Sequence, residues 1–381
     1  MRRGLQPHAQ PLPAAQRQPR LRRPRRPGGR ADAGGRGGRG PRRRPVLPGH
    51  HRRLPLRAGL GPHAAGGRHT HRQADAGLHQ ARRHGGRRRA GPVGSVTLHP
   101  QARAALQVWA AAGLPDRGDV EARRRAEREV ASREAGEPVD RVEDVDADGV
   151  GCRLYVPSGA RRAIVFAHGG GFVFGDLETH DAQARRIALR TGSAVLAVDY
   201  RRPPEHPFPA AADDVQRAGG WLVSTWDGPV VAMGDSAGGN LALVAALRDP
   251  GRYAALVAIY PFLDPTTSGD TYDRPHGGMS RADAAAFWEQ YAGDPADPDL
   301  APLRSDRLGT LPPTLVQAAG EDVLLAEDVL LAERIARAGG DVTLRVFPGL
   351  VHGFWRQPQL FDDAERSLAE IRTFLEAVGP A

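Results

Sequence analysis

The 381-residue sequence contains no lysine, a single cysteine and few aromatic residues. One cysteine cannot form an intramolecular disulfide, so the sequence excludes a secreted fold that is held together by disulfide bonds. We expect Cys152 to be a buried free thiol on a strand. No apolar run approaches the ~18 residues of a transmembrane helix, and the arginine-rich start lacks the apolar region of a secretory signal. These absences predict a soluble, cytoplasmic protein without a membrane partner.

The absence of lysine also excludes the phosphate-binding loop G-x-x-x-x-G-K-[ST], because that loop requires a lysine side chain. Paired cysteines and the pattern H-E-x-x-H are missing too, so no zinc site is indicated. We therefore expect neither a cofactor nor a metal. All 53 basic residues are arginine, as a GC-rich coding sequence would produce.

Residues 1–95 differ in composition from the rest of the chain. They contain 24 arginines and only two acids, which gives a charge of about +22. They contain no Phe, Tyr, Trp, Ile or Cys, so they cannot build a hydrophobic core. Three interpretations stay open: a tail that binds nucleic acid or another acidic surface, a solvated tail without a partner, or upstream sequence translated from a start codon assigned too early. We favour the third and do not expect a nucleic-acid partner, because helix signals first appear at "VTLHPQARAALQVWAAAG". Residues 96–381 form the predicted folded domain.

Within residues 96–381, short apolar runs alternate with helical patterns. A helix is predicted over 99–112 and a hairpin over "DRVEDVDADGVGCRLYVPS", which alternates around a D-G turn. Six buried strands are then predicted, at 163–167, 194–200, 230–234, 255–260, 314–319 and 342–347. Helices fit the intervals, for example 324–338 and 361–378. This alternation predicts an α/β fold with a mostly parallel, doubly wound sheet.

Ser236 lies in a sequence pattern that is typical of an exposed serine hydroxyl. It is the central residue of G-x-S-x-G in "VVAMGDSAGGNLALVAAL", directly after an apolar run and directly before a helix. A sharp turn from strand to helix exposes such a hydroxyl, and Gly234 and Gly238 let neighbouring backbone pass close by. The pattern therefore predicts Ser236 as a nucleophile.

A serine hydroxyl needs a base that is held by a third group. Asp322 follows one predicted strand and His352 follows the next, so both belong at the same sheet edge as Ser236. The chain order Ser236, Asp322, His352 is the order of an α/β-hydrolase relay. Asp328 and Asp341 are rival acids, but the first falls inside a predicted helix and the second precedes a strand, at the wrong edge. The rival bases His168, His180 and His206 are expected to be structural.

Three consecutive glycines in "IVFAHGGGFVFGD" follow the strand at 163–167. Glycine loses more conformational entropy on folding than other residues, so three in a row need a reason. We infer that another group must approach this backbone too closely for a side chain to fit. Attack on an ester carbonyl creates an oxyanion, and backbone N–H groups are effective donors to it. We expect Gly170, Gly171 and Ala237 to supply those donors.

These segments resemble the hormone-sensitive-lipase-like family of α/β-hydrolases, the bacterial carboxylesterases of family IV. The matching pieces occur in the family's order between about residues 97 and 378, and they are "HGGGFVFGD", "DYRRPPEHPFPAAADD", "GDSAGGNLA", "APLRSD", "LPPTLVQAAGEDVLLAED" and "HGFW". The resemblance implies a hydrolase core with a helical cap built from about 99–135 and 263–300. It also implies the same nucleophile, acid, base and oxyanion donors. Arg202 and Pro203 depart from the family's usual Leu and Ala, and "DVLLAED" lacks its usual Pro and Arg.

The sequence thus predicts a serine carboxylesterase that hydrolyses short-chain carboxylic esters through an acyl-enzyme. A lactone or N-acyl hydrolase with the same triad is the alternative, and a nucleic-acid-binding protein with an inactive core is a third reading. An apolar substrate pocket is expected from aromatic residues near the site, namely Phe172, Trp288, Phe354 and Trp355. Whether the chain forms a homodimer is left open.

Overall fold

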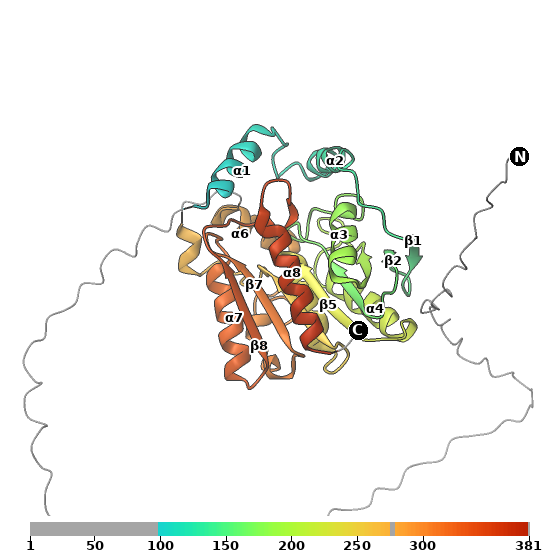
Figure 1. Cartoon of the computed structure of the whole chain (residues 1–381). Coiled ribbons are helices and arrows are strands. Elements are labelled where there is room, and N and C mark those ends of the chain that lie inside the picture. Colours follow the sequence, from blue (N-terminus) through green and yellow to red (C-terminus); the bar gives the residue numbers. More distant parts are fainter. Residues whose placement is uncertain (1–97, 275–278, 380–381) are drawn as a thin grey trace, which may run out of the picture. The chain divides into compact units, whose positions relative to one another are not determined.

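The computed structural model describes residues 98–274 and 279–379 (Figure 1). The 1–95 segment considered above lies outside the described residues. The strands form one eight-stranded sheet in the order β1-β2-β4-β3-β5-β6-β7-β8. Their bounds are β1 Arg141–Asp146, β2 Gly151–Val156, β3 Ala163–Ala167, β4 Ala194–Val198, β5 Val230–Asp235, β6 Ala255–Ile259, β7 Thr314–Ala319 and β8 Val342–Phe347.

Helices fill most of the intervals between the strands. The α-helices are α1 Pro100–Ala111, α2 Val120–Ala131, α3 Asp181–Thr191, α4 Ala210–Thr225, α5 Ala237–Arg248, α6 Arg281–Tyr291, α7 Leu325–Arg337 and α8 Asp362–Ala377. Short 3-10 helices are η1 Asp270–Asp273, η2 Pro302–Arg304, η3 Leu308–Thr310 and η4 Phe354–Arg356. The predicted α/β fold is confirmed, and each predicted strand agrees with the structure to within two residues at its ends.

The sheet is antiparallel at one edge and parallel elsewhere. β1 and β2 form the predicted hairpin, with Asp146 opposite Gly151, and the turn holds Asp148 and Gly149 at positive φ. β2 pairs with β4 antiparallel, and every later pair from β4 to β8 is parallel. Cys152 is buried on β2, as predicted, and burial raises the pKa of its thiol to about 12. This thiol is therefore not a nucleophile at neutral pH.

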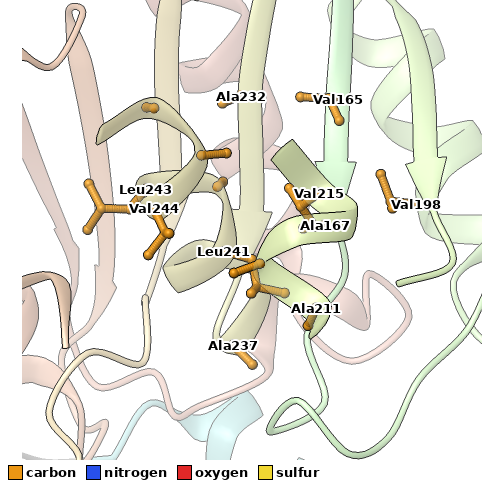
Figure 2. Packing of buried hydrophobic residues seen from close by; sticks show 14 of the residues in the cluster. Val165, Ala167, Val198, Ala211, Val215, Ala232, Ala237, Leu241, Leu243 and Val244 are labelled. Atoms are coloured by element: carbon orange, nitrogen blue, oxygen red, sulfur yellow. The ribbon is translucent and has the colours of Figure 1, made fainter. Parts of the chain in front are cut away.

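Alternate residues of each central strand face opposite sides of the sheet, because the side-chain period of a strand is two. On β3, Ile164 and Phe166 join a core with α3 and α8, whereas Val165 and Ala167 join a core with α4, α5 and α7. Figure 2 shows part of the second core, with Val165 and Ala167 of β3, Val215 of α4 and Leu241 of α5 among its labelled residues. Burial on both faces explains why these strands are almost continuously apolar.

The segment between β6 and β7 is the longest interruption of the strand–helix alternation. It contains α6, which begins with a capping box: the Ser280 hydroxyl accepts from Asp283 N–H, and the Asp283 carboxylate accepts from Ser280 N–H. In Figure 1, α6 lies at the same end of the described molecule as α1 and α2. These segments are therefore positioned to cover one end of the sheet.

Candidate functional site

Ser236 lies on a sharp turn between β5 and α5. Its backbone has φ 54° and ψ −121°, a conformation that residues with a side chain rarely adopt. A Cβ on Gly234 would lie 2.1 Å from Gly238 O, and one on Gly238 would lie 2.0 Å from Ala167 O. Both glycines are therefore required by close backbone contacts, which is the reason the sequence pattern suggested.

The structure brings Ser236, His352 and Asp322 into one hydrogen-bonded row. His352 Nε2 lies 3.0 Å from Ser236 Oγ, and His352 Nδ1 lies 2.7 Å from Asp322 Oδ2. A carboxylate only accepts, so Nδ1 carries the proton and Nε2 is left to accept from the hydroxyl. The row follows from the topology, because the three residues come after the carboxyl ends of parallel strands β5, β7 and β8.

Asp322 is held rigidly at the end of this row. Its side chain is fully buried, and Oδ1 accepts a hydrogen bond from Leu324 N–H at 3.0 Å. With Oδ1 engaged by the backbone, Oδ2 faces the imidazole. The carboxylate therefore fixes both the orientation and the tautomer of His352.

The rival residues do not contact Ser236 in the described structure. His168 is stacked between the rings of His180 and Tyr200, and burial lowers the pKa of His168 to about 3. His206 is exposed, and Asp341 precedes β8 at the opposite edge of the sheet. None of these groups is placed to exchange a proton with the serine.

Asp328, the main rival acid, is buried inside α7. Among the described residues, neither of its carboxylate oxygens has a hydrogen-bond partner. Burial raises the pKa of Asp328 well above its usual range, and the neighbouring Asp322 and Glu327 add to the rise. A carboxyl that does not contact the imidazole cannot orient it.

The glycine loop passes directly beside Ser236. Gly170 has φ 129° and Gly171 has φ 60°, and a Cβ on Gly171 would lie 2.5 Å from the Phe287 ring. Both glycines line the same cavity as Ser236, and Ala237 follows the serine at the first position of α5. Within the described part of the chain, the N–H groups of Gly170, Gly171 and Ala237 have no hydrogen-bond partner. They are available to an incoming oxygen.

Asp235 is a residue that the sequence reasoning missed. Its buried carboxylate accepts a hydrogen bond of 2.9 Å from Gly169 N–H, which ties the glycine loop to the turn that carries Ser236. The signal was present as the residue directly before the serine in "GDSAG". An aspartate directly before a serine indicates no particular structural role in a sequence. Only the fold shows that this carboxylate bonds to the glycine loop.

A cavity of about 170 Å³ opens at Ser236 and His352. Its apolar lining includes Phe174 of the glycine loop and Phe262, Met279 and Phe287 of the segment between β6 and β7. Charged groups complete it: Arg117, Arg123, Glu127, Asp235 and Arg356. The cavity can hold a small, partly apolar molecule against the serine.

The four aromatic residues predicted to form the pocket do not line this cavity, and this part of the prediction is corrected. Phe172 instead stacks on Tyr291 of α6, with 3.9 Å between ring centroids, and Trp288 packs against Phe262. Phe354 and Trp355 are fully buried in the core between the sheet and α8. Closeness in sequence to a site residue does not determine on which side of the chain a ring packs.

We predict that Asp328→Asn stabilises the protein at high pH. A carboxyl with a raised native pKa keeps a proton that the unfolded chain releases above its ordinary pKa of about 4, so the wild type loses stability as pH rises above that value. The variant lacks this penalty and should gain on the order of 1–3 kcal/mol in free energy of unfolding at pH 8. Urea unfolding at pH 4, 6 and 8 measures the gain, which should shrink toward pH 4.

Glu333→Gln is the matched control, because Glu333 lies on the same helix with its side chain about half exposed. It should change the free energy of unfolding by less than about 0.5 kcal/mol at each pH. Equal stability of wild type and Asp328→Asn at all three pH values would contradict the assignment of a buried protonated carboxyl.

Among residues 98–274 and 279–379, no group of three or more His, Cys, Asp or Glu side chains is arranged to hold a metal ion. None of the helices that the structure describes has the length and apolar character needed to cross a membrane.

The model of the α/β hydrolase fold family matches residues 164–356. The chain is 36% identical over 254 residues to the carboxylic ester hydrolase LipN of Mycobacterium tuberculosis, an alignment that covers 61% of this chain and 68% of LipN. It is 32% identical over 231 residues to the ethyl acetate hydrolase of Pseudomonas putida, covering 56% of this chain and 73% of that protein.

Solved esterase structures share the architecture. The hyperthermophilic esterase of the archaeon Pyrobaculum calidifontis superposes with a TM-score of 0.68 at 34% identity, covering 74% of this chain and 100% of that one. An esterase from the bacterial hormone-sensitive lipase family superposes with the same TM-score at 29% identity, covering 74% of this chain and 99% of that one.

Proposed function

Since this chain belongs to the hormone-sensitive-lipase-like family of α/β-hydrolases and is a carboxylic ester hydrolase, we propose that Ser236, His352 and Asp322 are its catalytic triad. The observation that carries the proposal is the hydrogen-bonded row, with 3.0 Å between Nε2 and Oγ and 2.7 Å between Nδ1 and Oδ2, at the wall of a cavity. This arrangement supports Ser236 as the nucleophile and His352 as its base.

In the proposed reaction, Ser236 Oγ attacks the ester carbonyl while His352 Nε2 removes the hydroxyl proton. The carbonyl oxygen becomes an anion, and the N–H groups of Gly170, Gly171 and Ala237 stabilise it. His352 then donates the proton to the departing alcohol, which leaves an acyl group on Ser236. A water molecule, deprotonated by the same imidazole, releases the acid and restores the serine.

The carboxylate of Asp322 stabilises the imidazolium that exists during each proton transfer. Its burial removes competing water, so that the charge interaction is stronger than it would be at the surface. No metal or cofactor takes part in this scheme, because the proton and the acyl group are both carried by side chains.

We propose that segments 99–135 and 263–300 form a cap over the site. In support, Arg117, Arg123 and Glu127 from the first segment and Phe287 from the second line the cavity together with Ser236. The ion pair of Arg117 with Asp283 joins the two segments directly. The cap would exclude water and limit the size of the substrate.

Short acyl chains are the proposed substrates. A cavity of about 150 Å³ holds a benzene-sized molecule, so about 170 Å³ fits an acyl group of only a few carbons. We expect kcat/KM for p-nitrophenyl esters to be highest at acetate to butyrate and to fall at least tenfold by decanoate. A rising rate from butyrate to decanoate, measured below the solubility limit of each ester, would contradict the short-chain assignment.

Hydrolysis of a lactone or an N-acyl compound by the same triad is the alternative function. Parallel assays with γ-butyrolactone and an acetanilide decide between them, and we expect the ester to be turned over at least a hundredfold faster. The cytoplasmic location, the homodimer and the lack of a nucleic-acid partner stay predictions.

A further inference from the structure

Arg356 is the last residue of η4, four residues after His352, and it lines the cavity that contains Ser236. Its side chain is half-buried. Among the described residues, its guanidinium forms no hydrogen bond and no ion pair. A guanidinium with open donors at the wall of a cavity is available to a ligand of opposite charge.

The other charged groups of the cavity wall have partners. Arg123 Nε donates to Glu127 at 2.7 Å, and Arg117 pairs with Asp283. Asp235 accepts the hydrogen bond from Gly169 N–H. Arg356 is therefore the cation at this site whose donors remain unengaged by the described protein.

The positive charge of Arg356 acts on Asp235, another residue that lines the cavity. Burial raises the pKa of Asp235, and the positive charge of Arg356 opposes that rise. Because Asp235 is the residue directly before Ser236, the guanidinium lies within electrostatic reach of the reacting centre. A substrate bound at Ser236 would therefore lie close to this cation.

We propose that Arg356 binds a carboxylate carried by the substrate, so that the preferred esters are short and bear one negative charge. A guanidinium offers paired N–H donors that match the two oxygens of a carboxylate. The volume of about 170 Å³ limits the distance between that carboxylate and the ester bond to a few carbon atoms. The inference rests on the proposed role of Ser236 as nucleophile.

The test compares esters that differ in charge and hardly in shape. Monomethyl succinate against methyl 4-oxopentanoate places the carboxylate on the acyl side, and acetoxyacetate against acetoxyacetone places it on the alcohol side. The measured quantity is the ratio of kcat/KM for the anionic ester to that for its neutral partner. We expect wild type to give a ratio of about ten or more in at least one pair.

Arg356→Gln should lower that ratio by about ten- to hundredfold, mainly through KM, because the pairing is made before and during the reaction alike. Arg356→Lys should keep part of it. Arg337→Gln, which removes a charge from a side chain that is 75% exposed on α7, is the control and should leave the ratio unchanged.

A wild-type ratio near one in both pairs would overturn the inference, and so would an equal loss on both members of each pair in Arg356→Gln, which marks a structural role. Failure of the underlying function looks different: the wild type would then hydrolyse neither these esters nor p-nitrophenyl acetate.

Discussion

We expect Ser236→Ala to lower kcat for p-nitrophenyl butyrate by about 10⁶-fold, to the limit set by background hydrolysis. The alanine removes the atom that forms the acyl-enzyme, and His352 Nε2, which lies 3.0 Å from that atom, loses the group that it deprotonates. Residual rate enhancement would come only from the oxyanion donors and substrate binding. Stopped assays at high enzyme concentration can measure a loss of this size.

Ser224→Ala is the matched control, because Ser224 is exposed on α4 and, within the described structure, its hydroxyl bonds only to the backbone oxygen of Trp221. It should retain the wild-type kcat and KM. A Ser236→Ala variant that is folded by circular dichroism and keeps more than about one hundredth of the wild-type kcat would refute the nucleophile assignment.

The second large effect is expected for Asp322→Asn, which should lower kcat by about 10⁴-fold with little change in KM. An amide in place of the carboxylate can donate to Nδ1, which would move the imidazole proton to Nε2. The nitrogen that faces Ser236 would then be a donor and could not accept the hydroxyl proton.

Asp328→Asn is the decisive comparison for that result. The two carboxyls are close in sequence and both are buried, but only Asp322 contacts the imidazole. We expect Asp328→Asn to keep kcat within about threefold of wild type. If Asp328→Asn caused the larger loss, the assignment of the acid would be reversed.

The sequence predicted the scaffold of the site because that scaffold depends on local patterns. Six apolar runs gave the strands, and parallel pairing then required the residues that follow β5, β7 and β8 to meet at one edge. The two glycines around Ser236 indicated that another backbone segment passes close by, and the structure shows this close approach between Gly238 and Ala167. Chain order and strand ends were sufficient to select Asp322 and His352.

The walls of the cavity were not predictable in this way. Phe172 and Phe174 are two residues apart in one loop, but Phe172 stacks on Tyr291 while Phe174 lines the cavity. A loop has no period that assigns its side chains to a face, so tertiary packing decides. The same limit applies to Asp328 and Arg356, because no sequence pattern shows that their side chains have no hydrogen-bond or ion-pair partner in the part of the chain that the structure describes.

The proposed mechanism requires that Ser236 becomes acylated during turnover. Its most direct test is peptide mass spectrometry of wild-type protein after treatment with diethyl p-nitrophenyl phosphate, which phosphorylates an activated serine. We expect one diethylphosphoryl group per chain, on the peptide that contains Ser236, and a loss of activity in proportion to labelling. Complete inactivation with the label on another residue, or full labelling of Ser236 with activity retained, would contradict it.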